Sequence, residues 1–131
     1  MNSKYFSGSG YSAAWYLGLV TGPGSGTSFA AADTLASHAG WTENTAYTGN
    51  RKAVTFGTAT TADPSVITNS AAPSTFTMNA NAQTIAGAFL CSVDTGTSGV
   101  LFSAGDFTGG DKIVDSGDTL SVTYTFSLDA A

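Results

Sequence analysis

The residues of this sequence that are equipped for chemistry are one histidine, one cysteine and nine carboxylates. Because His38 is the only histidine, a hydrolase mechanism would need a serine such as Ser103 and an acid such as Asp33 to converge on it. No GxSxG nucleophile elbow accompanies these residues, and a histidine at the C-terminal end of a helix already interacts favourably with the helix dipole. We therefore expect no catalysis by His38, and we expect that the protein is not an enzyme.

The single cysteine excludes an internal disulfide bond and a cluster of thiolate metal ligands. Cys91 lies inside an apolar run, so we expect a small, buried hydrophobic side chain. Residues 22–26 are rich in glycine, but no Lys-Ser or Lys-Thr pair follows them, which excludes a phosphate-binding loop. No cofactor is expected.

Most of the aspartates lie in turn contexts, where their side chains usually accept hydrogen bonds from the local backbone. These turn residues are Asp94, Asp106, Asp111, Asp115 and Asp118. The spacing between residues 106 and 118 fits no EF-hand loop. The sequence leaves open whether this turn-aspartate cluster binds Ca²⁺.

Small residues dominate the composition, with 20 Thr, 16 Ser, 20 Ala and 16 Gly among 131 residues. Disordered chains are usually highly charged, whereas here 10% of residues are charged and 11% are aromatic, which favours a folded protein. Four cations and a net charge of −5 argue against a nucleic-acid partner. No run approaches the ~18 apolar residues of a membrane span, so no membrane partner is expected.

A period-two alternation of apolar and hydroxyl residues is the main structural pattern. Its clearest instance is residues 119–128, where every even position is apolar and every odd position is Ser or Thr. Residues 84–93 are apolar on both faces and are expected to form a central strand, with residues 99–104 as its partner. Further strands are expected at residues 15–20, 53–56, 65–68, 74–78 and 112–114.

This spacing of strands and Gly/Asp turns predicts an all-β fold, an antiparallel β-sandwich that is either jelly-roll-like or immunoglobulin-like. One short helix is expected near residues 33–39, because Asp33 suits an N-cap and Gly40 a C-cap. Trp41 would then close one end of the sandwich, and Tyr47 is a second candidate for this role. We expect a single sandwich domain at residues 13–131.

Residues 1–12 form a Ser/Gly-rich N-terminal arm that nevertheless carries Tyr5, Phe6 and Tyr11. One interpretation is that the arm lays these three rings on a neighbouring surface, which makes them candidate partner-binding residues. The other is a frayed terminus. An apolar stretch at residues 13–20 loosely imitates a secretory signal, but the irregular segment after it does not suit a cleavage region. We expect an unprocessed protein made in a cytoplasm.

Several segments resemble a family of small bacteriophage virion proteins. The most specific is Ala32-Asp33-Thr34 followed by His-Ala-Gly-Trp-Thr-Glu at residues 38–43. Other similar segments are residues 15–19, 65–69, 84–90 and 117–124. The resemblance covers residues 15–128 and carries over no catalytic residues.

The resemblance implies a capsid decoration or cement protein on the outer surface of the head. Its partner would be the major capsid protein, it would form a homo-oligomer with a trimer favoured, and it would be synthesised in the host cytoplasm. An alternative is a tail-fibre or host-adhesion module of the virion that binds a glycan, because aromatic rings beside carboxylates suit sugars.

Overall fold

The computed structural model describes residues 14–128, and nearly all of their regular structure is β-strand. Every pair of strands is antiparallel, so the predicted antiparallel all-β fold is confirmed. The elements are β1 (Tyr16–Thr21), the 3₁₀ turn η1 (Gly24–Gly26), β2 (Glu43–Asn44), β3 (Lys52–Ala53), β4 (Ser65–Thr68), β5 (Ser74–Thr77), β6 (Gln83–Cys91), β7 (Leu101–Asp106), β8 (Lys112–Val114), β9 (Thr119–Val122) and β10 (Thr125–Leu128).

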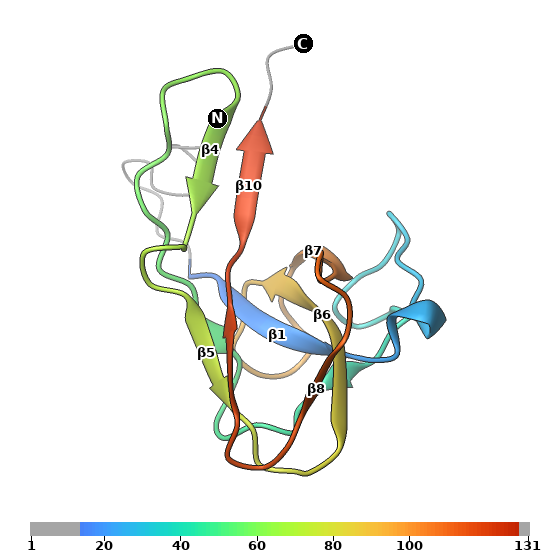
Figure 1. Cartoon of the computed structure of the whole chain (residues 1–131). Coiled ribbons are helices and arrows are strands. Elements are labelled where there is room, and N and C mark those ends of the chain that lie inside the picture. Colours follow the sequence, from blue (N-terminus) through green and yellow to red (C-terminus); the bar gives the residue numbers. More distant parts are fainter. Residues whose placement is uncertain (1–13, 129–131) are drawn as a thin grey trace.

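Strands β1 and β6 form the centre of the larger sheet (Figure 1). The strand order of this sheet is β2-β1-β6-β7. Strand β3 also pairs with β1, and β8 also pairs with β6. Both faces of β6 are covered, since Ile85 and Leu90 belong to one core cluster and Ala86 and Phe89 to another. The predictions of a central strand at residues 84–93 and of a partner at residues 99–104 are therefore confirmed.

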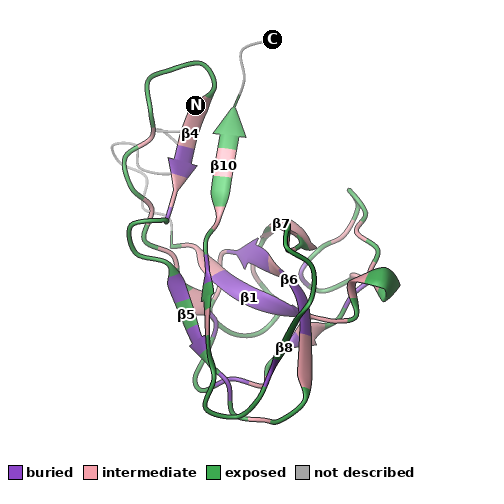
Figure 2. Ribbon diagram, viewed as in Figure 1, coloured by how far each residue is buried: buried purple, intermediate pink, exposed green. Residues whose placement is uncertain are grey.

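Strands β5 and β9 cover one face of this sheet. Phe76 and Val122 pack there against Leu17 and Leu19 of β1 in the first core cluster. The alternate residues of both strands point outward: Thr75, Thr77, Thr119 and Ser121 are all exposed. Figure 2 shows this alternation on β5 as bands of buried and exposed residues. The hydroxyl residues therefore occupy the solvent side, as the alternation predicts.

The opposite face of the sheet is covered by the loop of residues 27–42. Leu35 and Trp41 from this loop pack with Val20 and Phe89 in the second core cluster. Trp41 is buried, as expected, although it covers a face of the sheet rather than the end of a sandwich. Tyr47 is also buried and packs in the first cluster, edge-on to Phe76.

The prediction of a short helix near residues 33–39 is wrong, because this segment is a series of turns. Thr34 and Ser37 exchange backbone hydrogen bonds of 2.9 and 3.1 Å, which close a local loop. Gly40 does not cap a helix. It lies against Ser28, where a Cβ atom would come within 2.0 Å of the Ser28 carbonyl oxygen. Packing between distant residues here outweighs local helix signals.

The prediction of one continuous strand at residues 119–128 is wrong, because this segment divides into β9 and β10. The side chain of Asn69, which is completely buried, causes the division. Its Oδ1 accepts a 2.7 Å hydrogen bond from the backbone N–H of Tyr124, and its Nδ2 donates to the Val122 carbonyl at 3.3 Å. The amide thus takes the place of a neighbouring strand, and the chain changes partners from β5 to β4.

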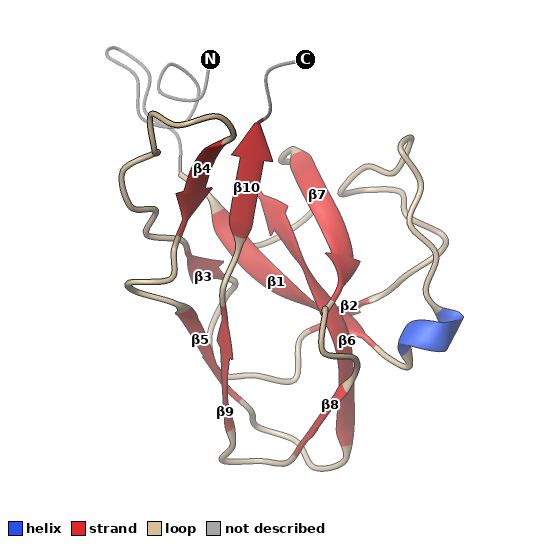
Figure 3. Ribbon diagram, turned by 45° about the horizontal axis from the view of Figure 1, so that its top comes forward, coloured by secondary structure: helices blue, strands red, loops and turns tan. Residues whose placement is uncertain are grey.

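The β4–β10 ribbon extends away from the larger sheet (Figure 3). Phe126 of β10 lies edge-on to Phe102 of β7, with 5.7 Å between the ring centroids. Phe102 in turn contacts Trp15 at 5.5 Å. A two-stranded ribbon is at best marginally stable alone, so these aromatic contacts help to hold it against the sheet.

The strand expected at residues 53–56 is shorter than predicted. Strand β3 ends at Ala53, although the N–H of Val54 still donates to the Trp15 carbonyl at 2.9 Å. Phe56 then packs edge-on to Tyr124, with the ring centroids 6.2 Å apart. After Val54 the chain therefore separates from β1 and packs instead against the β9–β10 junction.

Replacing Asn69 with alanine should destabilise the fold. The change leaves the Val122 carbonyl and the Tyr124 N–H without their partner, and each buried group without a hydrogen bond is costly. We expect the free energy of unfolding in urea to fall by about 2–4 kcal/mol. Asn79→Ala is the matched control, because Asn79 is exposed and should change stability by less than about 0.5 kcal/mol. Equal stability of the two variants would contradict this role of Asn69.

Candidate functional site

The three residues considered for a hydrolase do not form a catalytic arrangement. The Nδ1 of His38 donates to the Trp41 carbonyl at 2.8 Å, and its ring stacks on the indole at 3.7 Å. Asp33 accepts hydrogen bonds from the Trp41 indole and the Ala30 N–H. Ser103 bonds to Tyr124 at 2.7 Å. Asp33 and Ser103 do line one cavity of about 340 Å³, but His38 does not.

The aspartates that the sequence places in turns differ in their partners, and Asp106 is the last residue of β7 rather than a turn residue. Asp111 accepts from the N–H of Gly24 at 3.0 Å, and Asp118 accepts from the N–H of Asp115 at 2.8 Å. Asp106 accepts from the hydroxyl of Thr27 at 2.9 Å. Among residues 14–128, no three His, Cys, Asp or Glu side chains gather in a way that could ligate a metal ion.

No helix within residues 14–128 combines the length and the apolar character that crossing a bilayer requires. Cys91 is fully buried, as predicted, and burial raises the pKa of its thiol. The arm residues Tyr5, Phe6 and Tyr11, proposed from the sequence as partner-binding, lie outside the described residues.

A partly buried ion pair joins Glu43, which is half-buried, to the buried Arg51, and these are the only glutamate and the only arginine of the chain. The guanidinium donates from Nε to Oε2 at 2.9 Å and from Nη2 to Oε1 at 2.8 Å, and its Nη1 donates to the Val93 carbonyl at 3.1 Å. It also lies 5.2 Å from the centre of the Phe89 ring. The hydrogen bonds that Arg51 donates to Glu43 raise the pKa of the guanidinium above its usual value. Sequence reasoning missed this pair; the uniqueness of both residue types is the signal that was present.

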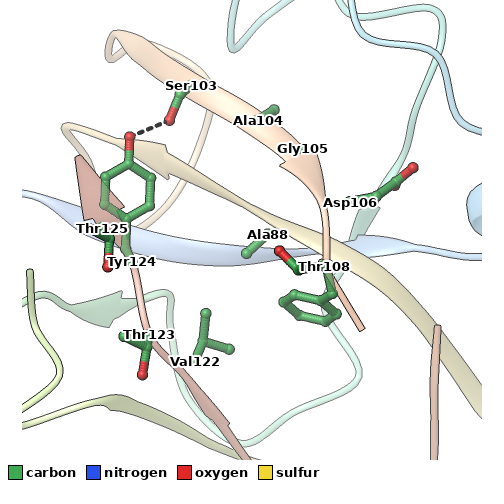
Figure 4. A pocket seen from close by; sticks show the side chains of 11 residues that line it. Ala88, Ser103, Ala104, Gly105, Asp106, Thr108, Val122, Thr123, Tyr124 and Thr125 are labelled. Atoms are coloured by element: carbon green, nitrogen blue, oxygen red, sulfur yellow. Dashed lines mark hydrogen bonds between the residues drawn. The ribbon is translucent and has the colours of Figure 1, made fainter. Parts of the chain in front are cut away.

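A surface groove of about 400 Å³ lies between β7 and the junction of β9 and β10 (Figure 4). Small residues of the sheet, Ala88 and Gly105, leave space in it, and the ring of Tyr124 stands at one side. The hydroxyls of Ser103 and Tyr124 bond to each other across the groove. Burial raises the pKa of Tyr124, so its hydroxyl stays protonated well into the alkaline range. The side of the groove formed by Ser103 and Tyr124 is therefore polar but uncharged.

Sequence reasoning named Ser103 and Asp106 for other roles but did not identify the groove. The groove exists because the chain switches sheets at Val122–Tyr124, and that switch depends on a hydrogen bond to the distant Asn69. Comparison of the chain with known protein families, curated proteins and solved structures gave no match.

Removing one partner of the ion pair should be more harmful than replacing both. Glu43→Gln leaves the Arg51 guanidinium, with 4% of its side chain exposed, without a counter-charge. We expect a loss of about 3 kcal/mol in the free energy of unfolding, most of which the double variant Glu43→Leu/Arg51→Met should recover. Lys112→Met, at an exposed lysine of β8, is the control and should be nearly neutral. Additive losses in the double variant would contradict this account.

Tyr47 should weaken the fold in alkaline solution. Burial raises the pKa of Tyr47 from 10.0 to about 12, and the nearby Glu43 adds to the shift while Arg51 opposes it. Between these two values the unfolded chain loses the proton and the folded chain keeps it, so unfolding becomes more favourable as the pH rises. The loss attributable to Tyr47 approaches about 2–3 kcal/mol at the upper end.

The measurement is urea unfolding from pH 9 to 12, compared between the original protein and Tyr47→Phe. The variant should lose less stability across this range. Part of the loss should remain in it, because the pKa values of Cys91 and Tyr124 are also raised in the folded state. Parallel curves for the two proteins would show that the ionisation of Tyr47 is not coupled to folding.

Proposed function

We propose that this protein is a non-enzymatic structural protein of a bacteriophage virion, a decoration or cement protein that binds the outside of the capsid shell. The observation that carries the proposal is the outer face of β5 and β9. Thr75 lies opposite Ser121 and Thr77 opposite Thr119, and all four are exposed. Two neighbouring strands thus present a continuous, uncharged, hydroxyl-bearing surface.

Such a surface is suited to permanent contact with another protein. Hydroxyl groups can exchange hydrogen bonds with water for hydrogen bonds with a partner, and burying them costs less than burying charged groups. The inner side of the same two strands is anchored by Phe76 and Val122 in the main core. The outer surface is therefore supported by a packed layer, which limits the conformational entropy lost on binding.

The sequence resemblance to small virion proteins supplies the partner, the major capsid protein. A symmetric shell offers the same contact many times, so a symmetric oligomer would multiply weak contacts into stable attachment. We propose a homo-oligomer, with a trimer favoured. The aromatic residues of the arm, Tyr5, Phe6 and Tyr11, would add apolar contacts across the seam between neighbouring capsid subunits.

The proposal predicts saturable binding of the purified protein to undecorated phage heads, together with a rise in the temperature at which the heads break. Thr75→Lys should weaken this binding at least tenfold, because it places a charge in the proposed contact surface. Thr45→Lys is the matched control, at an exposed threonine outside β5 and β9, and should bind like the original protein. Absence of saturable binding, or equal binding by both variants, would contradict the proposal.

Deleting residues 1–12 tests the arm within the same experiment. The shortened protein should bind heads more weakly while its thermal unfolding transition stays nearly unchanged. A large fall in melting temperature would assign the arm to the core of its own chain instead. Antibody labelling of intact particles separates the alternative function: signal over the head supports decoration, and signal at the tail tip supports a host-adhesion module.

A further inference from the structure

We propose that the groove between β7 and the β9–β10 junction is a binding site for an uncharged saccharide. None of the four exposed residues on the outer face of β5 and β9 lines this groove, and no residue of the arm is part of the proposed site. The test of this site is therefore independent of whether the protein binds a capsid. Three properties of the groove lead to this class of ligand.

The first property is the density of hydroxyl groups. Ser103, Thr108, Thr123, Tyr124 and Thr125 all line the groove. When Ser103 and Tyr124 bond to each other, only one of the two hydroxyls donates, so the second O–H remains available to a ligand. Figure 4 shows the Thr108 side chain directed into the space between β7 and the junction. The Thr125 hydroxyl already donates to Thr68 at 3.0 Å. A fully apolar ligand would cover the remaining O–H of the Ser103–Tyr124 pair and the Thr108 hydroxyl without offering them a partner, which is costly.

The second property is the charge of the site. None of the lining residues, all of which lie within residues 14–128, is Lys, Arg or His. Asp106 is the one acidic residue of the lining, and both of its carboxylate oxygens lie within 3.0 Å of the Thr27 hydroxyl oxygen. The whole chain carries a net charge of −5. A phosphate, sulfate or sialic acid group would therefore meet repulsion in this groove and no compensating cation.

The third property is that aromatic rings line the groove beside an unfilled space at Gly105. The rings of Phe107 and Tyr124 provide apolar surfaces on which the C–H faces of a sugar can pack. A Cβ atom on Gly105 would meet no atom within 4 Å, so the backbone of β7 leaves real space here. The volume of about 400 Å³ lies at the lower end of ordinary ligand sites. One or two sugar rings match this size.

Gly105 also provides the sharpest test. Because nothing lies near its missing Cβ atom, Gly105→Leu should fill the groove while the fold remains intact. Gly26→Leu is the matched control: its Cβ position is likewise empty, and residue 26 does not line the groove. Thermal unfolding of both variants should resemble that of the original protein.

The experiment is binding of the labelled full chain to an array of neutral, sialylated and sulfated glycans. We expect binding confined to neutral glycans, lost in Gly105→Leu and kept in Gly26→Leu. Thr108→Val removes one hydroxyl at nearly constant shape and should weaken binding about 2- to 10-fold. This second variant tests the site even where Gly105→Leu fails to fold.

Three results would overturn the proposal. These are no binding above background to any neutral glycan, preferential binding to sulfated or sialylated glycans, and undiminished binding by both groove variants. Amide chemical-shift changes on titration with a neutral glycan identified by the array then locate the site. Changes centred on residues 103–108 and 122–125 support the groove, and changes centred elsewhere contradict it.

Discussion

Much of this structure depends on the two hydrogen bonds that the buried side chain of Asn69 forms with the backbone of Val122 and Tyr124. The amide of Asn69 takes the hydrogen-bonding positions that a neighbouring strand would fill, between Val122 and Tyr124. One long amphipathic segment thereby contributes to two sheets, packing through β9 on the main body and through β10 on the ribbon with β4. The groove lies at this same junction, so the geometry of the proposed saccharide site follows from the switch.

Scarcity of charge shapes both the interior and the surface. The partly buried ion pair found among residues 14–128 uses the only arginine and the only glutamate, and it joins β2 to the segment that leads into β3. On the outer face of β5 and β9, exposed threonine and serine hydroxyls, rather than charged groups, bind water. A surface of this kind remains hydrated when free and loses little on becoming covered, which is the property that the proposed attachment to a particle requires.

The strands were predictable because period-two alternation is a local signal. Residues 74–78 and 119–122 place their apolar side chains inward as the pattern indicates. The helix prediction failed because Leu35 and Trp41 gain more from packing against the sheet than the segment gains from local hydrogen bonds. The break at Tyr124 was not predictable, since the alternation continues through it and the cause lies 55 residues away.

The candidate site shows the same limit. The hydroxyl residues of the groove come from β7 and from the β9–β10 junction, and alternation alone gives neither their distance nor the gap between them. The pairing of Glu43 with Arg51 likewise depends on how β2 and the chain before β3 lie beside β1. The positions of these side chains relative to one another are therefore set by pairing between strands that lie far apart in the sequence, which composition and periodicity do not reveal.

The proposed function is tested most directly by locating this protein in a reconstruction of a phage particle that contains it. We predict symmetric copies of the fold on the outside of the head, with the hydroxyl-bearing outer face of β5 and β9 against the major capsid protein. Density for this fold at the tail, or heads whose outer surface lacks it, would contradict the proposed function.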